Sequence, residues 1–372
     1  MRMKVFITAL SAAALLAPSC GEEERPSEPD GANAVRLLAV DTSSVEGTGW
    51  EPVSGATIRV SSPTFEFYKV YETGPTGWAM LDNLPAGVYR ISAEKINQDE
   101  NYMILGQKEL SLVYEPHAVD SIFMNYQQSS PLVINEIYYA GCDYAKFYFY
   151  DQFIELYNSS SETRYLDGYF LVRTTQVAEV IDPEAEDYAL GYYVFAFPGE
   201  SGVTHDIPIE PGEFVVVAAD AIDHSRFGAR CVDLSGADWE FFNSLGSDYD
   251  NPAVPNLLPI SNLTNDFSMN LAHTAVLLSD GTDWEYGMHF EPSVNDFKEY
   301  VHIPLTTILD GVEYSSNPDS DRYLTIRVDA GFAGVGMARY SGRSVQRRFP
   351  GLDSNNSSFD FEIIEPPTPG YQ

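Results

Sequence analysis

The sequence is poor in basic residues, histidine and cysteine. Its 372 residues include 21 lysines and arginines, six histidines and three cysteines, against 55 aspartates and glutamates. The formal net charge of −34 repels phosphate backbones, so we expect no nucleic-acid partner. Three explanations of this acid-rich, lysine-poor balance stay open: solubility through self-repulsion, adaptation to saline surroundings, and capture of cations.

Recognisable catalytic signatures are also absent from the sequence. It contains no Gly-x-Ser-x-Gly, His-Glu-x-x-His, Walker-type or paired Cys-x-x-Cys pattern. The histidines are scattered, and the adjacent pairs at 205–206 and 223–224 lack the spacing of a metal-binding set. We therefore predict no catalytic residues and no enzyme activity. The alternative is a hydrolase with an unfamiliar carboxylate or Ca²⁺-assisted site in its loops.

Long apolar runs are absent except near the N-terminus. Residues 5–16 form an apolar stretch after the basic Arg2 and Lys4, and small residues stand directly before Cys20. The stretch is shorter than the roughly 20 residues that a membrane-spanning helix needs. The layout resembles a bacterial lipoprotein signal, which implies removal of residues 1–19 and attachment of lipid to Cys20. The implied partner is a membrane, and the expected location is the outer membrane.

Residues 20–34 are expected to form a flexible acidic tether. They combine repeated acids with Pro and Gly and have no large apolar residue, so ordering them would not be offset by burial. Acids just after the cysteine resemble the export signal of Bacteroidota surface lipoproteins. That resemblance implies display on the cell surface, with a plain spacer on the periplasmic face as the alternative.

The remaining chain has the composition of an all-β protein. Aromatic, Gly and Pro residues are frequent and long helical periodicity is absent. The length suffices for two domains, each with its own core. We predict two immunoglobulin-like β-sandwiches in tandem, of which the second is larger and carries loop insertions.

The first domain is expected at residues 35–126. Apolar residues alternate with polar ones at 56–60 and 89–93, which is the period of half-buried strands, and turn residues stand at 73–77 and 84–87. This order resembles the carboxypeptidase-regulatory-like (transthyretin-like) β-sandwich family. The resemblance implies a spacer or interaction module rather than an enzyme.

The second domain is expected at residues 131–372. The segments at 133–139, 152–158 and 166–171 resemble the opening strands of the lamin-tail domain. Together with residues 232–257, the chain resembles a family of Bacteroidota lipoproteins of unknown function. That family implies association with the outer membrane, often near TonB-dependent uptake systems, and offers no functional residues to carry over.

Binding residues are expected in the insertions of this domain, at 140–152, 174–206 and 223–272, because long loops on a rigid scaffold commonly carry function. Aromatic residues crowd two of these segments and could contact a sugar or a protein partner. The alternative for the same residues is ordinary strand packing. The candidate aromatics are Tyr148, Tyr150, Tyr188, Tyr192 and Tyr193.

Two further groups of residues are candidates for covalent or metal bonds. Cys142 and Cys231 form an even pair in an exported chain, which favours a disulfide over two buried free thiols. No cofactor is predicted, although alternating oxygen side chains in two places could suit Ca²⁺. The alternative is a turn rich in Asn and Asp. These weak metal candidates are Asn317, Asp319, Asp321, Asp248 and Asp250.

The function that these patterns favour is a non-enzymatic binding or interaction module on the cell surface. Its partner would be an outer-membrane transporter, with a possible role accessory to TonB-dependent uptake, or a surface ligand. A purely structural surface component is the remaining alternative.

Overall fold

The structure is a computed structural model in which nearly all regular elements are strands. The predictions for residues 1–32, including Cys20, and for Tyr148 and Asp248 lie outside the described residues. Among described residues, the helices are the 3₁₀ turn η1 (Leu305–Thr307) and the single turn α1 (Ser357–Asp360). The all-β prediction is therefore confirmed. The structure describes residues 33–42, 51–62, 65, 67–97, 102–114, 117–128, 131–143, 150–175, 184–244, 249–261, 267–291, 294–351 and 353–372.

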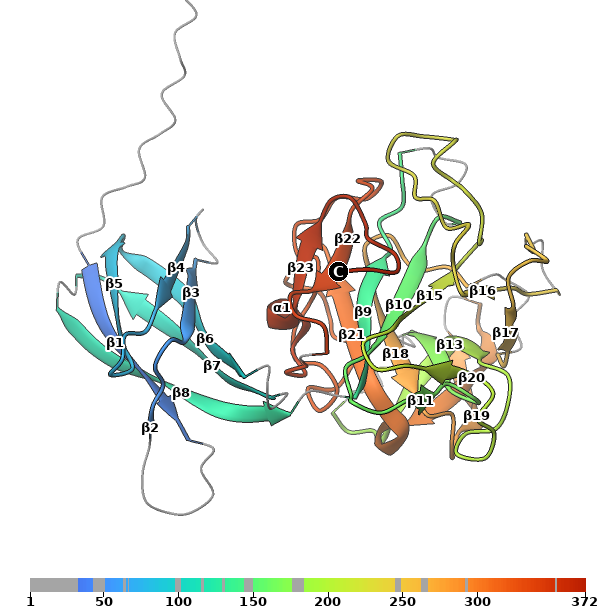
Figure 1. Ribbon diagram of the computed structural model, residues 1–372, viewed down its shortest axis with the longest axis horizontal. Coiled ribbons are helices and arrows are strands. Elements are labelled where there is room, and N and C mark those ends of the chain that lie inside the picture. Colours follow the sequence, from blue (N-terminus) through green and yellow to red (C-terminus); the bar gives the residue numbers. More distant parts are fainter. Residues whose placement is uncertain are drawn as a thin grey trace, which may run out of the picture.

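The first unit is one eight-stranded sheet that curls around its own core (Figure 1). Its strand order is β2-β1-β8-β7-β6-β3-β4. The strand β5 also pairs with β1, along residues 33–38, next to the short pairing of β1 with β2. Alternate residues of β1 and β3 are fully buried, as the period of two in the sequence predicts. The strands are β1 (Asn33–Asp41), β2 (Glu51–Pro52), β3 (Thr57–Ser61), β4 (Tyr68–Glu72), β5 (Trp78–Leu84), β6 (Gly87–Asn97), β7 (Tyr102–Leu112) and β8 (Ala118–Gln128).

The second unit is a sandwich of two layers. One layer contains β15, β10, β9, β22 and β23, and the other contains β21, β18, β12, β13 and the hairpin β19–β20. The short strands β16 and β17 join the two layers at one side. The strands of this unit are β9 (Leu132–Tyr138), β10 (Phe153–Asn158), β11 (Arg164–Tyr165), β12 (Phe170–Thr174), β13 (Tyr188–Ala196), β14 (Pro208–Ile209), β15 (Phe214–Ala218), β16 (Trp239–Phe241), β17 (Asn256–Pro259), β18 (His273–Ser279), β19 (Glu285–Glu291), β20 (Asp296–Pro304), β21 (Ile308–Ser315), β22 (Ser344–Arg347) and β23 (Phe361–Ile364).

The core of the second unit lies between its layers, and further clusters cover the outer faces. Ile137 and Ile154 from one layer meet Val276 and Tyr314 from the other in the same cluster. Every residue of β9 is buried, because its outer face is covered too. The C-terminal residues provide that cover, so both ends of this unit's sequence meet at β9.

The prediction of a loop insertion at residues 174–206 is wrong for much of that range. Residues Tyr188–Ala196 form β13, which pairs with β12, β17 and β20 in the sheet. A search for alternation misses residues 188–196, because seven of the nine are buried and the strand is covered on both faces. Residues 223–272 likewise contribute β16 and β17, which connect the two layers. Deleting 174–206 would therefore remove part of the sheet.

Within the part of the chain that is described, no helix is long and apolar enough to cross a membrane.

Candidate functional site

A hollow lies between the two units and is lined by residues of β3, β4 and β6 from the first and of α1 and β23 from the second. Figure 1 shows β3 and β4 on the side of the first unit that faces α1 and β23. It is a cleft of about 390 Å³. Boundaries between domains are common places for ligand sites, because two walls can enclose a ligand. The side chains that carry its chemistry are Arg59, Arg90 and Glu94 on one wall and Phe332, Arg348, Phe359, Phe361 and Glu362 on the other.

Alternation along paired strands aims the polar wall at the cleft. In β3, Ile58 and Val60 are fully buried in the core, so Arg59 between them points outward. In the neighbouring β6, Arg90 pairs in register with Ser61, the next outward residue of β3. Arg59 forms an ion pair with Glu94, which lies on the same face of β6, two residues beyond the register partner of Arg59, Ser92. Arg90, the other arginine of this wall, forms no ion pair with any described residue.

The opposite wall is mainly apolar, includes three phenylalanines and carries one arginine. Arg348 directly follows β22, and its backbone N–H donates to the carbonyl oxygen of Asp360 at 2.7 Å. The Nε of its guanidinium is shielded from water and makes no hydrogen bond within the described structure. A buried donor without a partner is uncommon and points to a missing acceptor. Phe359 and Phe361 also line this wall, and the Phe361 ring is buried and packs against the Arg347 guanidinium.

The charge of the cleft contrasts with that of the whole chain. The lining has three arginines and two glutamates, whereas the sequence has 21 basic against 55 acidic residues. Within the lining, Glu94 already pairs with Arg59, so Glu362 is the remaining acid beside Arg90 and Arg348; outside the lining, Glu109 of β7 lies opposite Arg90 in register. Guanidinium groups suit oxyanions such as carboxylate, sulfate and phosphate, because two N–H groups can donate to two oxygens of one anion. The arrangement can therefore hold a ligand that combines an acidic group with an apolar or aromatic body.

The aromatic residues predicted to bind lie elsewhere. Tyr188, Tyr192 and Tyr193 are all on β13, so they are strand residues and not loop residues, which corrects the expected placement. Tyr193 is buried in the core, while Tyr188 and Tyr192 are half-buried on the opposite face. Tyr150 is half-buried in the turn before β10. None of these four lines the cleft.

The weak Ca²⁺ candidates are exposed turn residues. The Oδ1 of Asn317 accepts the backbone N–H of Asp319 at 3.1 Å, which is an Asx turn. Asp250 accepts the side-chain amide of Asn256 at 2.9 Å. In the described segments, these residues and Asp321 are in no group of three ligand atoms close enough to hold an ion.

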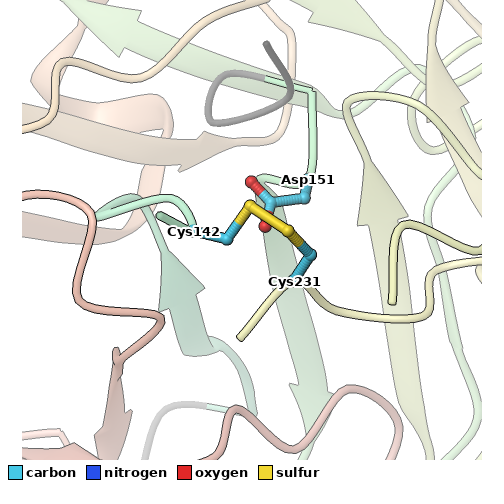
Figure 2. A group of neighbouring side chains, drawn as sticks. All are labelled: Cys142, Asp151 and Cys231. Carbon is cyan, nitrogen blue, oxygen red and sulfur yellow. A yellow bond between two sulfur atoms is a disulfide. The ribbon is translucent and has the colours of Figure 1, made fainter. Parts of the chain in front are cut away.

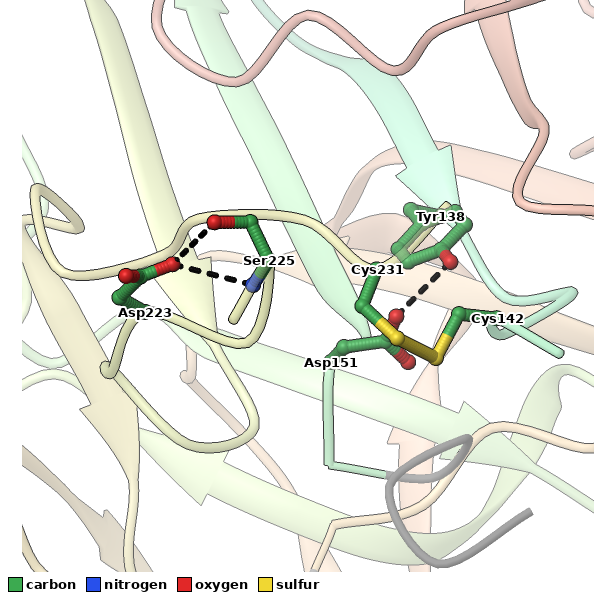
Figure 3. The surroundings of a disulfide bond; sticks show 6 residues. All are labelled: Tyr138, Cys142, Asp151, Asp223, Ser225 and Cys231. Carbon is green, nitrogen blue, oxygen red and sulfur yellow. Dashed lines mark hydrogen bonds between the residues drawn. A yellow bond between two sulfur atoms is a disulfide. The ribbon is translucent and has the colours of Figure 1, made fainter. Parts of the chain in front are cut away.

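The described residues do contain one such group of three, formed by Cys142, Asp151 and Cys231 (Figure 2). The two cysteines are joined by a disulfide, and Asp151 lies beside it (Figure 3). Tyr138 Oη donates to Asp151 Oδ2 at 2.9 Å, and burial raises the pKa of Asp151 to about 7. Because metal ligation requires thiolates, the oxidised pair is a covalent tie and no metal centre.

Two buried glutamates from the predicted opening strands hold the C-terminal segment. Glu136 accepts from the Thr368 backbone N–H at 3.1 Å and from the Thr368 hydroxyl at 2.8 Å. Glu155 accepts the backbone N–H of Gly370 at 2.6 Å, and burial raises its pKa to about 8. Paired acids with shifted pKa values are what a hydrolase needs. Here, however, both carboxylates are occupied by the chain's own end, which makes them structural.

Part of the chain is similar to a protein family of unknown function. Residues 210–368 match the family described as protein of unknown function (DUF4876). The crystal structure of a DUF4876 family protein from Bacteroides thetaiotaomicron is 22% identical, with a TM-score of 0.54. The alignment covers 89% of this chain and 94% of that one, and it shows a shared fold. Among curated proteins, none matches the sequence.

Two surface proteins give much weaker structural matches. A putative cell adhesion protein from Bacteroides eggerthii is 7% identical over 90% of this chain and 95% of its own, with a TM-score of 0.20. The major pilin SpaD from Corynebacterium diphtheriae is 12% identical over 43% of this chain and 49% of its own, with the same TM-score. Scores this low carry no conclusion about this chain. The prediction of a domain of unknown function is confirmed by the family match alone.

Proposed function

We propose that this protein is a non-enzymatic binding module, held at the outer membrane by lipid on Cys20, that captures a ligand between its two units. The ligand would carry an acidic group and an apolar body. The observation that carries this proposal is the cleft in which Arg90 on one wall faces Arg348 and three phenylalanines on the other. The Nε of Arg348 has no acceptor among the described residues, and a bound anion would supply one.

The remaining parts of the chain would then determine where capture takes place. The acidic tether would give reach, and the carboxypeptidase-regulatory-like first unit would act both as spacer and as one wall of the cleft. The lamin-tail-like second unit would supply the mainly apolar wall. In this arrangement the protein would present its ligand at the cell surface, next to an outer-membrane transporter.

The first prediction tests the cleft with anilinonaphthalene sulfonate, a fluorescent probe that combines an aromatic body with an anion. Replacing Arg348 with glutamine is expected to weaken probe binding about tenfold, because a hydrogen bond to a charged group contributes roughly 1.5–3 kcal/mol. Arg90→Gln should weaken binding to a similar extent. Fluorescence titration of the purified chain measures both.

A matched control is Arg339→Gln, since Arg339 is exposed and lies outside the cleft. It should leave probe affinity unchanged. Far-ultraviolet circular dichroism of each variant checks that the fold is kept. Equal affinities for the wild type and both cleft variants would show that the cleft does not recognise anions.

The second prediction tests the anchor. Cys20→Ala removes the thiol to which lipid would be attached, so the chain should leave the membrane fraction and stop incorporating labelled palmitate. Immunoblots of separated membrane and soluble fractions measure the change. Protease treatment of intact cells then distinguishes display on the surface, where the wild type is cut, from attachment on the periplasmic face. A variant that still sediments with membranes and incorporates label would contradict the proposed anchor.

A further inference from the structure

The two walls of the cleft use their strands differently. On the first unit, alternate residues line the cleft, namely 59 and 61 of β3 and 90, 92 and 94 of β6. That wall is therefore the outer face of a sheet, because successive side chains of a strand point to opposite faces. From β23, in contrast, the consecutive residues Phe361, Glu362 and Ile363 line the cleft. A strand contributes consecutive residues where it presents its edge, so β23 turns its backbone edge towards the cleft.

The side of β23 that faces away from β22 is free. The strand is the last in its sheet and pairs with β22. In an antiparallel pair, residues that bond the neighbour alternate with residues whose N–H and C=O point the other way. Just before β23, the Arg348 N–H donates to the carbonyl oxygen of Asp360 at 2.7 Å, and the register continues with Glu362 opposite Gln346. Glu362 therefore bonds β22, and Ile363 turns its N–H and C=O to the free side.

Three backbone groups are thus offered to a ligand along this edge. They are the N–H and C=O of Ile363 and the C=O of Phe361, since the N–H of Phe361 donates to Ser357 in α1. None of the three is paired with another residue in the described part of the chain. The Ile363 side chain is 38% exposed, so the edge can be reached. An open edge of this kind accepts an extended peptide as an added strand.

The position of Arg348 determines which end of a peptide fits. Arg348 lies opposite Asp360, where β23 begins, and it lines the cleft there. A strand added antiparallel to β23 would run towards that point and finish at it, because the two strands have opposite directions. Its terminal carboxylate would then meet Arg348, whose Nε has no acceptor among the described residues. Arg90 on the facing wall supplies a second guanidinium.

The chain's own C-terminal segment is bound elsewhere. Thr368 is held by Glu136 and Gly370 by Glu155, both on the strands β9 and β10. The occupant of the cleft is therefore the end of a different polypeptide. The volume of about 390 Å³ lies within the roughly 300–1,000 Å³ of ligand pockets, which gives room for the last few residues of a chain.

We propose, resting on the cleft function proposed above, that the ligand is the C-terminal end of a polypeptide, bound as an extended strand antiparallel to β23. The terminal carboxylate lies between Arg348 and Arg90. The peptide backbone pairs with Ile363 and Phe361, which provides affinity without regard to sequence. An apolar side chain of the peptide packs against Phe359, which is half-buried on the same wall.

The third prediction tests the carboxylate with the peptide Lys-Thr-Val-Thr-Val-Phe. In isothermal titration calorimetry with the full chain, the peptide with a C-terminal amide should bind at least about tenfold more weakly than the free acid, because a charged hydrogen bond is lost. In Arg348→Gln, acid and amide should bind within about twofold of each other. Arg339→Gln is the matched control, and it should keep the full difference between acid and amide.

N-methylated versions of the same peptide test the strand. With the carboxylate at Arg348, the N–H groups of the last and the third-from-last residue point towards β23. Methylating either nitrogen should weaken binding about three- to tenfold, because one backbone hydrogen bond is lost. Methylating the residue between them should change affinity by less than about twofold, since its N–H points away. These comparisons leave the protein unchanged, so its folding does not affect them.

Failure of the strand and failure of the cleft give different results. No binding of the free-acid peptide at millimolar concentration, or equal losses at all three methylated positions, would overturn the proposed strand. If Arg348→Gln still weakened the binding of anilinonaphthalene sulfonate, the cleft would recognise small acidic aromatic molecules instead. If that probe also bound the variant and the wild type equally, the proposed cleft function would fail together with the strand.

Discussion

Replacing Arg347 with methionine should lower the free energy of unfolding of the second unit by about 3–5 kcal/mol. The Arg347 side chain is 1% exposed and donates from Nη2 to Asp310 at 2.8 Å and from Nε to the carbonyl oxygen of Ile134 at 2.9 Å. Asp353 and Asp360 face its remaining nitrogen at 3.5 and 3.4 Å. Without the guanidinium, the buried carboxyl groups of Asp310 and Asp360 lose their cationic partner. Removing one partner of a buried ion pair typically costs about 3–5 kcal/mol.

The same contacts explain why Arg347 affects the whole unit. It lies on β22, while Ile134 belongs to β9 of the same layer and Asp310 to β21 of the other layer. Asp310 also accepts the backbone N–H of Ile134 at 2.7 Å. One side chain therefore ties the two layers and the C-terminal segment together.

The loss in Arg347→Met should depend on pH in a defined direction. Burial raises the pKa of Asp310 and of Asp360, and it does so against the pull of Arg347. Acids with a raised folded pKa bind more protons when folded, so stability falls as pH rises from the unfolded value towards the folded one. Removing the guanidinium enlarges that shift. The variant should therefore be nearest to wild type below about pH 6 and should weaken relative to it from about pH 7 to 8 upwards, where Asp310 and Asp360 of the wild type ionise.

Differential scanning calorimetry between pH 4 and 8 measures this effect. At neutral pH the transition of the second unit should move down by roughly 10 °C, given a few degrees per kcal/mol at this size. Arg343→Met is the matched control, because Arg343 is half-exposed and its pair with Glu365 is a surface contact. It should change stability by less than about 1 kcal/mol. A shift no larger than the control's would show that the buried acids are neutral without Arg347.

How well the fold could be predicted depended on which faces of each strand are buried. Alternation predicted the strands at 56–60 and 89–93 because β3 and β6 cover a core on one face and are open on the other. The strand β13 was missed because it is covered on both sides, so its sequence is continuously apolar and aromatic. Crowded aromatics were consequently assigned to a loop.

The candidate cleft could be predicted less well, since it depends on contacts between residues that are distant in sequence. Arg59 and Arg90 were visible as the polar members of alternating strands, but nothing local indicates that Arg348 faces them across a domain boundary.

Removing the disulfide is expected to cost about as much as removing Arg347. Cys142 and Cys231 are 89 residues apart, and the chain-entropy model gives about 4–5 kcal/mol for a loop of that length, with 2–5 kcal/mol typical of native bridges. The double replacement Cys142→Ala and Cys231→Ala should therefore destabilise the second unit by about 2–5 kcal/mol. Chemical denaturation of the variant, and of wild type with and without reductant, measures the loss. Reduced wild type should match the variant.

The position of the bridge predicts where the weakened unit opens first. Cys231 belongs to the segment that lies over the outer face of β10 and β15, where Leu234 packs in one cluster with Phe153 and Val216. Without the disulfide to Cys142, this covering segment is held less firmly than the strands of the sheets. Limited proteolysis should therefore cleave near residues 223–238 earlier than within the strands. Cleavage spread evenly over the unit would contradict a local role.

Asp151 provides an internal reporter of the same opening. Its pKa is raised to about 7 by burial beside the disulfide. If the cover lifts, water reaches the carboxylate and its pKa should fall towards its ordinary value near 4. A Tyr138→Phe variant, which removes the hydrogen bond but keeps the cover, should instead raise the pKa further, because that bond favours the charged form. Carboxyl titration by nuclear magnetic resonance separates the two, since opening and loss of the hydrogen bond move the same group in opposite directions.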